Sequence, residues 1–311
     1  MQHCSTRFLG ILLILFSVCA PATKPAAGAG AIPSDSASYQ AIEPKLLLPV
    51  QPGSVRFAVI GDNGTGHGPQ YQIAESMTDL HHLFPYTFVL MLGDNLYGGE
   101  RRKDFVVKFE RPYQTLLEAG VKFYASLGNH DDAKQRDYED FNMGGRRYYS
   151  FSSAGVRFFA LDSTLMDQKQ LAWFEQELQR SSEIWRVCFF HHPIYSSGRR
   201  HGSDVKLRAL LEPLFMKYRV NAVFSGHDHL YERIQAQNGI YYFVSGAAGK
   251  IRRRNIRESS LTAKGYDQDL SYMLVEIAGE NLHFQVISRT GTTVDSGVLP
   301  RLNGSSTEPR P

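Results

Sequence analysis

Short apolar runs and amphipathic stretches alternate along most of the chain. The apolar runs, which are rich in β-branched and aromatic residues, occupy residues 55–60, 87–92, 121–127, 156–161, 185–190, 220–224 and 240–245. Between them, apolar residues recur at helical spacing over residues 70–84, 105–119, 168–180 and 204–217. Strands that alternate with helices in this way predict an α/β domain with largely parallel strands.

The C-terminal part follows a different pattern. Residues 271–299 contain three strand-like runs that are separated by the short stretches "GEN" and "TGT", which predicts an antiparallel meander. The chain shows no repeat and no internal linker. We therefore predict one domain over residues 53–300, preceded by a linker or lead-in at residues 32–52 and followed by a flexible tail at residues 301–311.

The N-terminus has the pattern of a targeting segment. Arg7 precedes an apolar run from Phe8 to Ala20, and small residues follow that run. This pattern is typical of a secretory signal, so we expect residues 1–31 to be a signal peptide and the protein to be exported. The run is too short to favour a transmembrane helix. A lipid anchor at Cys19 is the alternative, but Val18 directly before it fits such a site poorly.

Composition narrows the classes of function. Hydrophobic residues make up 42% of the 311 residues and charged residues 21%, as in ordinary soluble proteins. A net charge of +3 is too small to indicate binding to nucleic acid or to a membrane surface. Beyond the leader, Cys188 is the single cysteine, and it stands within the apolar run "VCFFH". We therefore expect neither an internal disulfide nor a thiol nucleophile.

Polar residues collect directly after five of the apolar runs. Ligands of open α/β sheets bind at the carboxyl ends of the strands, so these residues are expected to meet at one edge. Each cluster alone is weak evidence, because Gly-Asp often forms a turn and His-x-His is often structural. Five clusters in succession favour a functional site. Its candidates are Asp62, Asp94, Tyr97, Asn129, His130, His191, His192, His227 and His229.

The types of donor group limit which metal ions can bind. Carboxylate, amide, phenol and imidazole groups without a thiolate suit zinc, manganese or iron. Seven of these nine candidates would already saturate a single ion and leave no place for a substrate. Two ions about 3.5–4 Å apart that share a carboxylate accommodate all of them, and such pairs catalyse phosphoryl transfer.

The ordered motifs "GDNG", "GDNLY", "GNHD", "FHHP" and "GHDH" resemble those of the calcineurin-like metallophosphoesterases, and within them the purple acid phosphatase branch. The resemblance covers residues 55 to about 290 and implies a four-layer α-β-β-α sandwich of two mixed β-sheets flanked by helices. Most members carry a metal-binding histidine where Gly64 stands here. The purple branch instead supplies a tyrosine three residues after the second aspartate, where Tyr97 stands.

The resemblance implies a role for each candidate. Asp62, Asp94, Tyr97 and His229 would hold the first metal, and Asp94, Asn129, His191 and His227 would hold the second, with Asp94 bridging. A phenol loses its proton at neutral or acidic pH only to a strongly Lewis-acidic ion, so Fe(III) is expected beside Tyr97. Fe(II), Zn or Mn is expected at the other position. In the alternative, Tyr97 packs over the site without binding.

Two further histidines have implied roles. His130 matches a residue that contacts the phosphate and protonates the leaving group, and His192 would orient its neighbours or face the substrate. The implied activity is hydrolysis of phosphate monoesters, in a small molecule or a phosphoprotein, by attack of a metal-bound hydroxide. The alternatives are a Mn- or Zn-dependent phosphodiesterase or nucleotidase and, from another class, a non-catalytic metal-binding surface protein. No nucleic-acid partner or membrane span is expected, and the sequence indicates no oligomeric state.

A basic segment follows the strand after the last histidine motif. The stretch "GKIRRRNIR" contains Lys250, Arg252, Arg253, Arg254 and Arg257 and should lie near the same edge as the metals. It would attract an anionic substrate, with Arg252 and Arg253 as candidate substrate-binding residues. A solvated basic loop is the alternative. The same two interpretations apply to Arg101, Arg102 and Lys103.

Overall fold

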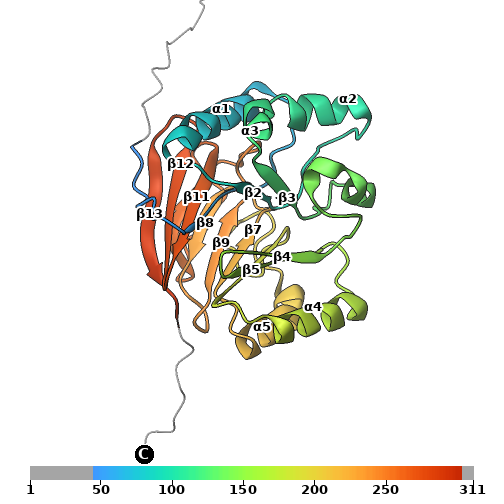
Figure 1. The fold of residues 1–311 in the computed structure, drawn as a ribbon, viewed down its shortest axis with the longest axis vertical. Helices are drawn as coiled ribbons and strands as arrows, with labels where there is room; N and C mark the ends of the chain where they lie inside the picture. Colours follow the sequence, from blue (N-terminus) through green and yellow to red (C-terminus); the bar gives the residue numbers. More distant parts are fainter. Residues whose placement is uncertain (1–44, 303–311) are drawn as a thin grey trace, which may run out of the picture. The chain divides into compact units, whose positions relative to one another are not determined.

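The computed structural model describes residues 45–302. The expected signal peptide, residues 32–44 of the expected lead-in and residues 303–311 of the expected tail lie outside the described residues. Two β-sheets make up the centre of the fold (Figure 1). The first has the strand order β13 (Thr293–Pro300), β12 (Asn281–Ser288), β11 (Ser271–Ala278), β1 (Val55–Ile60), β2 (Phe88–Met91) and β3 (Lys122–Ala125).

The second sheet has seven strands. Their order is β10 (Thr262–Tyr266), β8 (Tyr231–Ile234), β9 (Tyr241–Ser245), β7 (Ala222–Ser225), β6 (Trp185–Phe190), β5 (Val156–Ala160) and β4 (Tyr149–Ser153). The helices are α1 (Gly68–Leu83), α2 (Arg102–Phe105), α3 (Gln114–Glu118), α4 (Gln168–Arg180) and α5 (Val205–Lys217). The π-helical segment η1 (Val106–Glu110) follows α2, and two short 3-10 segments, η2 (Ala133–Asp137) and η3 (Glu139–Phe141), follow β3.

Alternating side chains of β5 show how the layers are stacked. Phe158 points to the first sheet, where its ring lies 5.4 Å from that of Phe57. Phe159 points the other way and lies 5.5 Å from Phe174 of α4. Phe215 of α5 packs against Phe174 as well, so α4 and α5 cover the outer face of the second sheet (Figure 1). This alternation follows from the two-residue period of a strand that is buried on both faces.

Helix α1 covers the other side of the first sheet. The hydroxyl of Ser76 lies 2.9 Å from that of Tyr272 in β11, and Ile73 and Met77 are fully buried in the core. The order of layers is therefore helix, sheet, sheet, helix, as the family resemblance implied. Figure 1 shows α1 and α3 on one side of the two sheets and α4 and α5 on the other.

Each sheet contains one contiguous group of parallel strands. In the first sheet this group is β1, β2 and β3, at one edge, and in the second it is β5, β6, β7 and β9, in the centre; the strands outside these groups pair antiparallel. The expectation of largely parallel strands is therefore correct only for these two groups. The remainder is antiparallel because short turns such as that between β11 and β12 cannot make the long crossover that parallel strands need.

The expected helix over residues 105–119 is not a single helix. Arg111 donates to the carbonyl of Val106, five residues back, and the chain then turns before α3 begins. Pro112 has no N–H to continue the ladder, and the freed carbonyl of Lys108 accepts the side chain of Gln70 instead. Strands β4, β8 and β10 were missed because stretches such as "YERI" and "TAKGY" contain few apolar residues.

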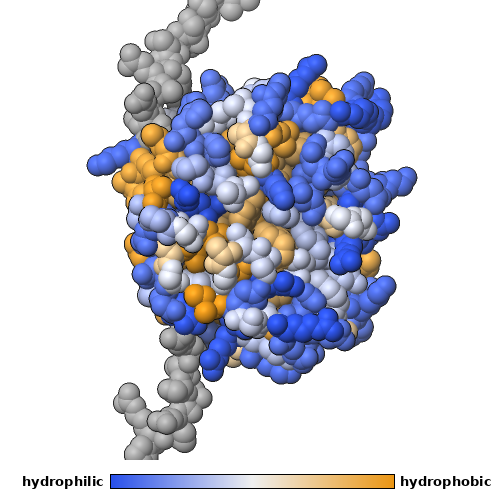
Figure 2. All heavy atoms as spheres, in the orientation of Figure 1, coloured by the Kyte–Doolittle hydropathy of each residue, from blue (hydrophilic) through white to orange (hydrophobic). Residues whose placement is uncertain are grey.

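The described residues also show where the lead-in ends, what the surface presents and where Cys188 lies. Glu276 and Gln285 accept the backbone N–H groups of Val50 and Leu47, so this end of the lead-in lies along the first sheet. Hydrophilic side chains cover most of the face in Figure 2, with small apolar areas between them. Within residues 45–302, no helix is long and apolar enough to cross a membrane. Cys188 is buried, as expected.

Candidate metal centre

The first group of candidate ligands converges around the phenol of Tyr97. Its hydroxyl donates to Oδ1 of Asp62 at 3.0 Å and lies 3.2 Å from Nε2 of His229. The same His229 nitrogen is 3.3 Å from Oδ1 of Asp62. Asp62 follows β1, Tyr97 follows β2 and His229 follows β7, so strands from both sheets deliver these three groups to one point.

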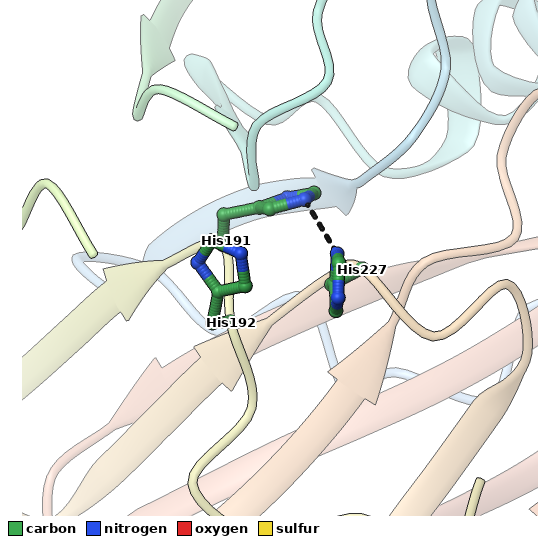
Figure 3. A group of neighbouring side chains, drawn as sticks. All are labelled: His191, His192 and His227. Carbon is green, nitrogen blue, oxygen red and sulfur yellow. Dashed lines mark hydrogen bonds between the residues drawn. The ribbon is translucent and has the colours of Figure 1, made fainter. Parts of the chain in front are cut away.

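The second group surrounds Nε2 of His191. This atom lies 3.0 Å from Oδ1 of Asn129, 3.1 Å from Nδ1 of His227 and 3.4 Å from Oδ1 of Asp94. Figure 3 shows His191 and His227 joined by their hydrogen bond at the ends of the strands. The other ring nitrogen of His191 donates to the carbonyl of Leu92 at 2.9 Å, which fixes the tautomer that leaves Nε2 free for a metal.

Asp94 belongs to both groups. It contacts His191 of the second group, and its carboxylate lies within 4.8 Å of ligand atoms of Asp62 and His229 in the first. A bridging carboxylate must occupy such a shared position. Asp62, Asp94, Tyr97 and Asn129 come from loops of the first sheet, and His191, His227 and His229 come from the second sheet. The oxygen donors therefore enter from one sheet and the nitrogen donors from the other.

Backbone geometry holds the ligands in place. Asp62, Asp94 and His227 have φ values of 54°, 50° and 67°, in the left-handed region that residues other than glycine rarely adopt. Strained backbone of this kind persists only where surrounding contacts enforce it. The N–H of His227 donates to Asp62 at 2.8 Å and the N–H of His130 donates to Asp94 at 2.9 Å, so the strained loops also orient the carboxylates.

Gly64 leaves no room for a side chain, although the resemblance places a histidine here in most members. A Cβ at this position would lie 1.7 Å from the carbonyl oxygen of Asn95, in the loop that leads to Tyr97. The N–H of Tyr97 also donates to the carbonyl of Gly64 at 2.9 Å. The close approach that brings the phenol to Asp62 thus excludes any side chain at residue 64.

Gly64→Ala should therefore destabilise the protein strongly. We expect a loss of about 3 kcal/mol or more in the free energy of unfolding, because backbone must move to relieve the clash. Urea denaturation measures this loss. Gly68→Ala is the matched control, since nothing lies within 4 Å of a Cβ there, and it should change stability by less than about 1 kcal/mol. Equal stability of the two variants would contradict the close approach.

The charges of the site suit cations. Asp62 and Asp94 are almost completely buried, and in the described part of the chain their ion-pair partners are imidazoles rather than Lys or Arg. Buried carboxylates without a cationic partner are strongly unfavourable. Burial acts to raise the pKa of Asp62, but the hydrogen bond with His229 and the nearby His191 outweigh it and lower the pKa to about 2.

The imidazole of His227 is in the form that binds metal. Burial, followed by the repulsion of His191 and His192, lowers the pKa of His227 to about 2, so the ring is neutral. Ionised carboxylates and neutral imidazoles are the protonation states of metal ligands. Two groups, Asp62–Asp94–His229 and His191–His192–His227, each bring three ligand atoms within 4.8 Å of one another. The donor set, without a thiolate, therefore fits zinc, manganese or iron.

A family model described as calcineurin-like phosphoesterase matches residues 55–231, more than half of the chain. The chain belongs to the calcineurin-like phosphoesterases. This phosphoesterase is a metal-dependent phosphoric ester hydrolase, as the motifs predicted. The predicted fold of two mixed sheets with flanking helices is confirmed as well.

Curated relatives of the chain include tartrate-resistant and purple acid phosphatases. The phosphoesterase is 25% identical to tartrate-resistant acid phosphatase type 5 of Rattus norvegicus over 313 aligned positions, which cover 82% of this chain and 95% of the rat protein. It is 28% identical to purple acid phosphatase 15 of Arabidopsis thaliana over 238 positions, which cover 63% of this chain and 43% of the plant protein.

Solved structures share the fold. Purple acid phosphatase PPD1 from yellow lupin superposes with a TM-score of 0.65 at 17% identity, covering 82% of this chain and 55% of that one. GAP50, described as the anchor in the inner membrane complex of Plasmodium, superposes with a TM-score of 0.68 at 19% identity, covering 80% and 89%. At these identities the likeness concerns the fold alone.

The phenol of Tyr97 is held protonated in this phosphoesterase. Burial raises the pKa of Tyr97 far above its usual value, and the charges of Asp62 and Asp94 raise it further. The ammonium of Lys250 lies 3.3 Å from the centre of the phenol ring and is the nearby positive charge. Only a strongly Lewis-acidic cation would displace the proton and bind the oxygen.

Three imidazoles lie beside the ligands. His130 is exposed, with its ring 5.0 Å from that of Tyr97. His192 is half-buried, its Nδ1 lies 2.9 Å from the hydroxyl of Ser163, and burial lowers its pKa to about 4. His201, which the sequence did not single out, places its ring 4.1 Å from that of His227. Its only sequence mark is the pair "HG" ten residues after His191.

Two carboxylates to which the sequence assigned no role, half-buried Asp131 and buried Asp228, hold the loops in place. Asp131 of "GNHD" accepts the N–H groups of Gly128, Asn95 and Leu96, and so ties the third motif to the second. Asp228 of "GHDH" accepts the hydroxyl of Ser196 at 2.6 Å and the N–H of Gly202 at 3.1 Å. Since these residues flank His201, Asp228 holds that histidine beside the centre.

The two arginines chosen from the sequence as substrate-binding lie at the rim of the centre. The N–H of Arg252 donates to the carbonyl of His229 at 3.0 Å, and Arg253 is exposed in the turn that follows. In the basic run at residues 101–103, Arg101 forms an ion pair with Asp104 and Arg102 forms one with Glu110. These two arginines therefore already have acidic partners within the protein.

Proposed function

We propose that this phosphoesterase is a binuclear phosphomonoesterase of the purple acid phosphatase type. One observation carries the proposal. The phenol oxygen of Tyr97 lies within hydrogen-bond distance of Asp62 and His229, while a side chain at residue 64 is sterically excluded. The same ligand replacement defines the purple branch, and tartrate-resistant and purple acid phosphatases are among the relatives.

The proposed metals follow the donor sets. Fe(III) would be held by Asp62, Asp94, Tyr97 and His229, and Fe(II), Zn or Mn by Asp94, Asn129, His191 and His227. When bound, the two ions lower the pKa of water and offset the charge that develops on the phosphate oxygens. Asp94 would contribute to both positions, because it contacts His191 of the second group and lies within 4.8 Å of ligand atoms of Asp62 and His229 in the first.

The imidazoles around the ligands handle substrate and protons. His130 is solvent-exposed at the end of the third loop, so it can reach the leaving-group oxygen and protonate it. His192 donates to or accepts from Ser163 through Nδ1, which leaves Nε2 for the substrate side. With its pKa lowered to about 4, the His192 ring is neutral above that pH and acts as a hydrogen-bonding rather than an ionic contact.

Elemental analysis with parallel kinetics tests the proposal. The isolated protein should contain about two metal ions per chain with iron among them, absorb visible light and lose activity on chelation. It should hydrolyse p-nitrophenyl phosphate faster than bis(p-nitrophenyl) phosphate between about pH 4 and pH 9. A colourless manganese or zinc protein that prefers the diester would support the phosphodiesterase or nucleotidase alternative. No hydrolysis with any metal would support the non-catalytic one.

We also propose that the protein is exported. The basis is the sequence of residues 1–31, in which a basic residue, an apolar run and small residues follow one another. N-terminal sequencing of protein recovered outside the cytoplasm, in the periplasm or the medium, would test this. A mature chain that still begins at Met1 would contradict cleavage.

A further inference from the structure

Two loops beside the metal centre carry six arginines, which we call the arginine rim. Arg199 and Arg200 belong to residues 196–203, and the other four, Arg252, Arg253, Arg254 and Arg257, belong to residues 249–258. All except Arg252 are exposed, and Arg252 is half-buried. The six charges are twice the net charge of +3 of the whole chain.

The rim is built on a buried polar scaffold. Asn255 is buried and accepts the N–H of Arg199 through its carbonyl at 2.6 Å and that of Arg200 through its side chain at 3.0 Å. Asp267, also buried, accepts the N–H of Asn255 at 2.7 Å. A β-bridge between Gly198 and Ile256 joins the loops directly. The backbone positions of the arginines are therefore fixed.

Both loops contact the metal centre. Arg252 donates its N–H to the carbonyl of His229, and Lys250 lies over the ring of Tyr97. On the other loop, the ring of His201 lies 4.1 Å from that of His227. One residue spans about 3.5 Å, so Arg200 lies within a few ångströms of His201. The arginine rim therefore begins next to the metal centre.

The guanidinium groups of the rim make almost no contacts with the rest of the protein. In the described residues no carboxylate forms an ion pair with any of the six, and only Arg257 makes a side-chain hydrogen bond, to the carbonyl of Gly198 at 3.1 Å. Glu258 shares a surface hollow with Arg254 and Arg257 without pairing with them. Elsewhere, most arginines have a carboxylate partner, as Arg102, Arg147, Arg157, Arg233, Arg289 and Arg301 do.

We propose that the arginine rim binds the additional phosphate groups of a small polyphosphorylated substrate while one of its phosphates is hydrolysed at the metal centre. This inference rests on the proposed function. A single phosphate would already be neutralised by the two ions, so six further cations exceed what a simple monoester requires. Guanidinium groups form paired hydrogen bonds with phosphate oxygens, which lysines in the same place would not.

The test compares selectivity rather than activity alone. Wild type should show a higher kcat/KM for inorganic tripolyphosphate, inositol hexakisphosphate and ATP than for p-nitrophenyl phosphate. In Arg199→Ser/Arg200→Ser and in Arg253→Ser/Arg254→Asn, this ratio should fall about tenfold, as each pair removes two charge-assisted contacts. Asn is chosen at residue 254 because its φ of 58° is left-handed. Raising the ionic strength should reduce the wild-type ratio.

The control removes two positive charges from the opposite edge. Lys122 begins β3 and Arg219 precedes β7, both at the amino ends of strands. Lys122→Ser/Arg219→Asn should keep the wild-type ratio, since these charges lie away from the carboxyl ends. If it lowers the ratio as far as the rim variants do, net charge alone acts and the proposal is wrong. An advantage for ATP that tripolyphosphate does not share would also overturn it, because recognition would then involve the base.

A binding measurement tests the role of the arginine rim independently of the proposed function. Inositol hexasulfate is a polyanion that the enzyme cannot dephosphorylate. Calorimetry on the metal-loaded protein should give a dissociation constant about tenfold weaker in the rim variants than in wild type and in the control. Unchanged binding would refute the proposed role of the arginine rim. If wild type hydrolyses no phosphoester with any metal, the proposed function fails, yet this binding comparison still decides the role of the arginines.

Discussion

Asp94→Asn should reduce kcat for p-nitrophenyl phosphate by about 10³-fold or more, because the bridging group contributes to holding both metals. Asparagine has the size of aspartate and can still accept the N–H of His130 through its side-chain oxygen. What it loses is the charge that offsets two neighbouring cations. Elemental analysis should show fewer than two ions per chain after dialysis, which separates this variant from one that loses only a catalytic group.

Stability without metal provides the control for Asp94→Asn. In the metal-free protein the variant should unfold at a Tm no lower than that of wild type, since it removes a buried charge that no Lys or Arg of the described residues pairs with. In the metal-loaded protein the order should reverse. Wild-type turnover, or two tightly held ions in the variant, would show that Asp94 does not bridge.

Tyr97→Phe should abolish the visible absorption that the proposed iron site predicts and weaken the metal at that position by at least about 100-fold. Phenylalanine fills the same volume but offers no oxygen to the ion. It also removes the hydroxyl that now donates to Asp62 at 3.0 Å. Spectra and metal analysis of the purified variant measure both effects.

A second tyrosine serves as the control for this change. Tyr218 lies after α5, where its hydroxyl donates to Glu175 at 2.8 Å, and Tyr218→Phe should leave both colour and metal content unchanged. If Tyr97→Phe keeps the full spectrum of wild type, the phenol packs over the centre without binding, and the assignment to the purple branch loses its main support.

The residues that the sequence picked out lie together in the structure because the placement of each one is local. Each candidate ligand stands directly after an apolar run, and a strand that is buried on both faces leaves little ambiguity about where its carboxyl end lies. Gly64 and Tyr97 could even be connected by motif comparison before their contact was known. The steric reason, a Cβ 1.7 Å from Asn95, required the coordinates.

What the sequence missed depends on long-range contacts. His201 stands in an exposed loop whose position is set by Asp228 and Asn255, far from it in sequence. Likewise, the basic run near residue 250 and the one near residue 101 looked equivalent. Only the fold shows that Arg101 and Arg102 have acidic partners while the arginines of the rim do not. The expected helix over residues 105–119 breaks at Pro112, and the carbonyl of Lys108 that this break frees accepts the side chain of Gln70, 38 residues away.

The division of donors between the two sheets has a consequence for metal preference. The loops of the first sheet alone offer carboxylate, amide and phenol oxygens, a set that favours magnesium, calcium or manganese. The imidazoles, which favour zinc or iron, come from the second sheet. A preference for zinc or iron therefore depends on the packing of the two sheets against each other, so a substitution that shifts one sheet should weaken it without touching a ligand.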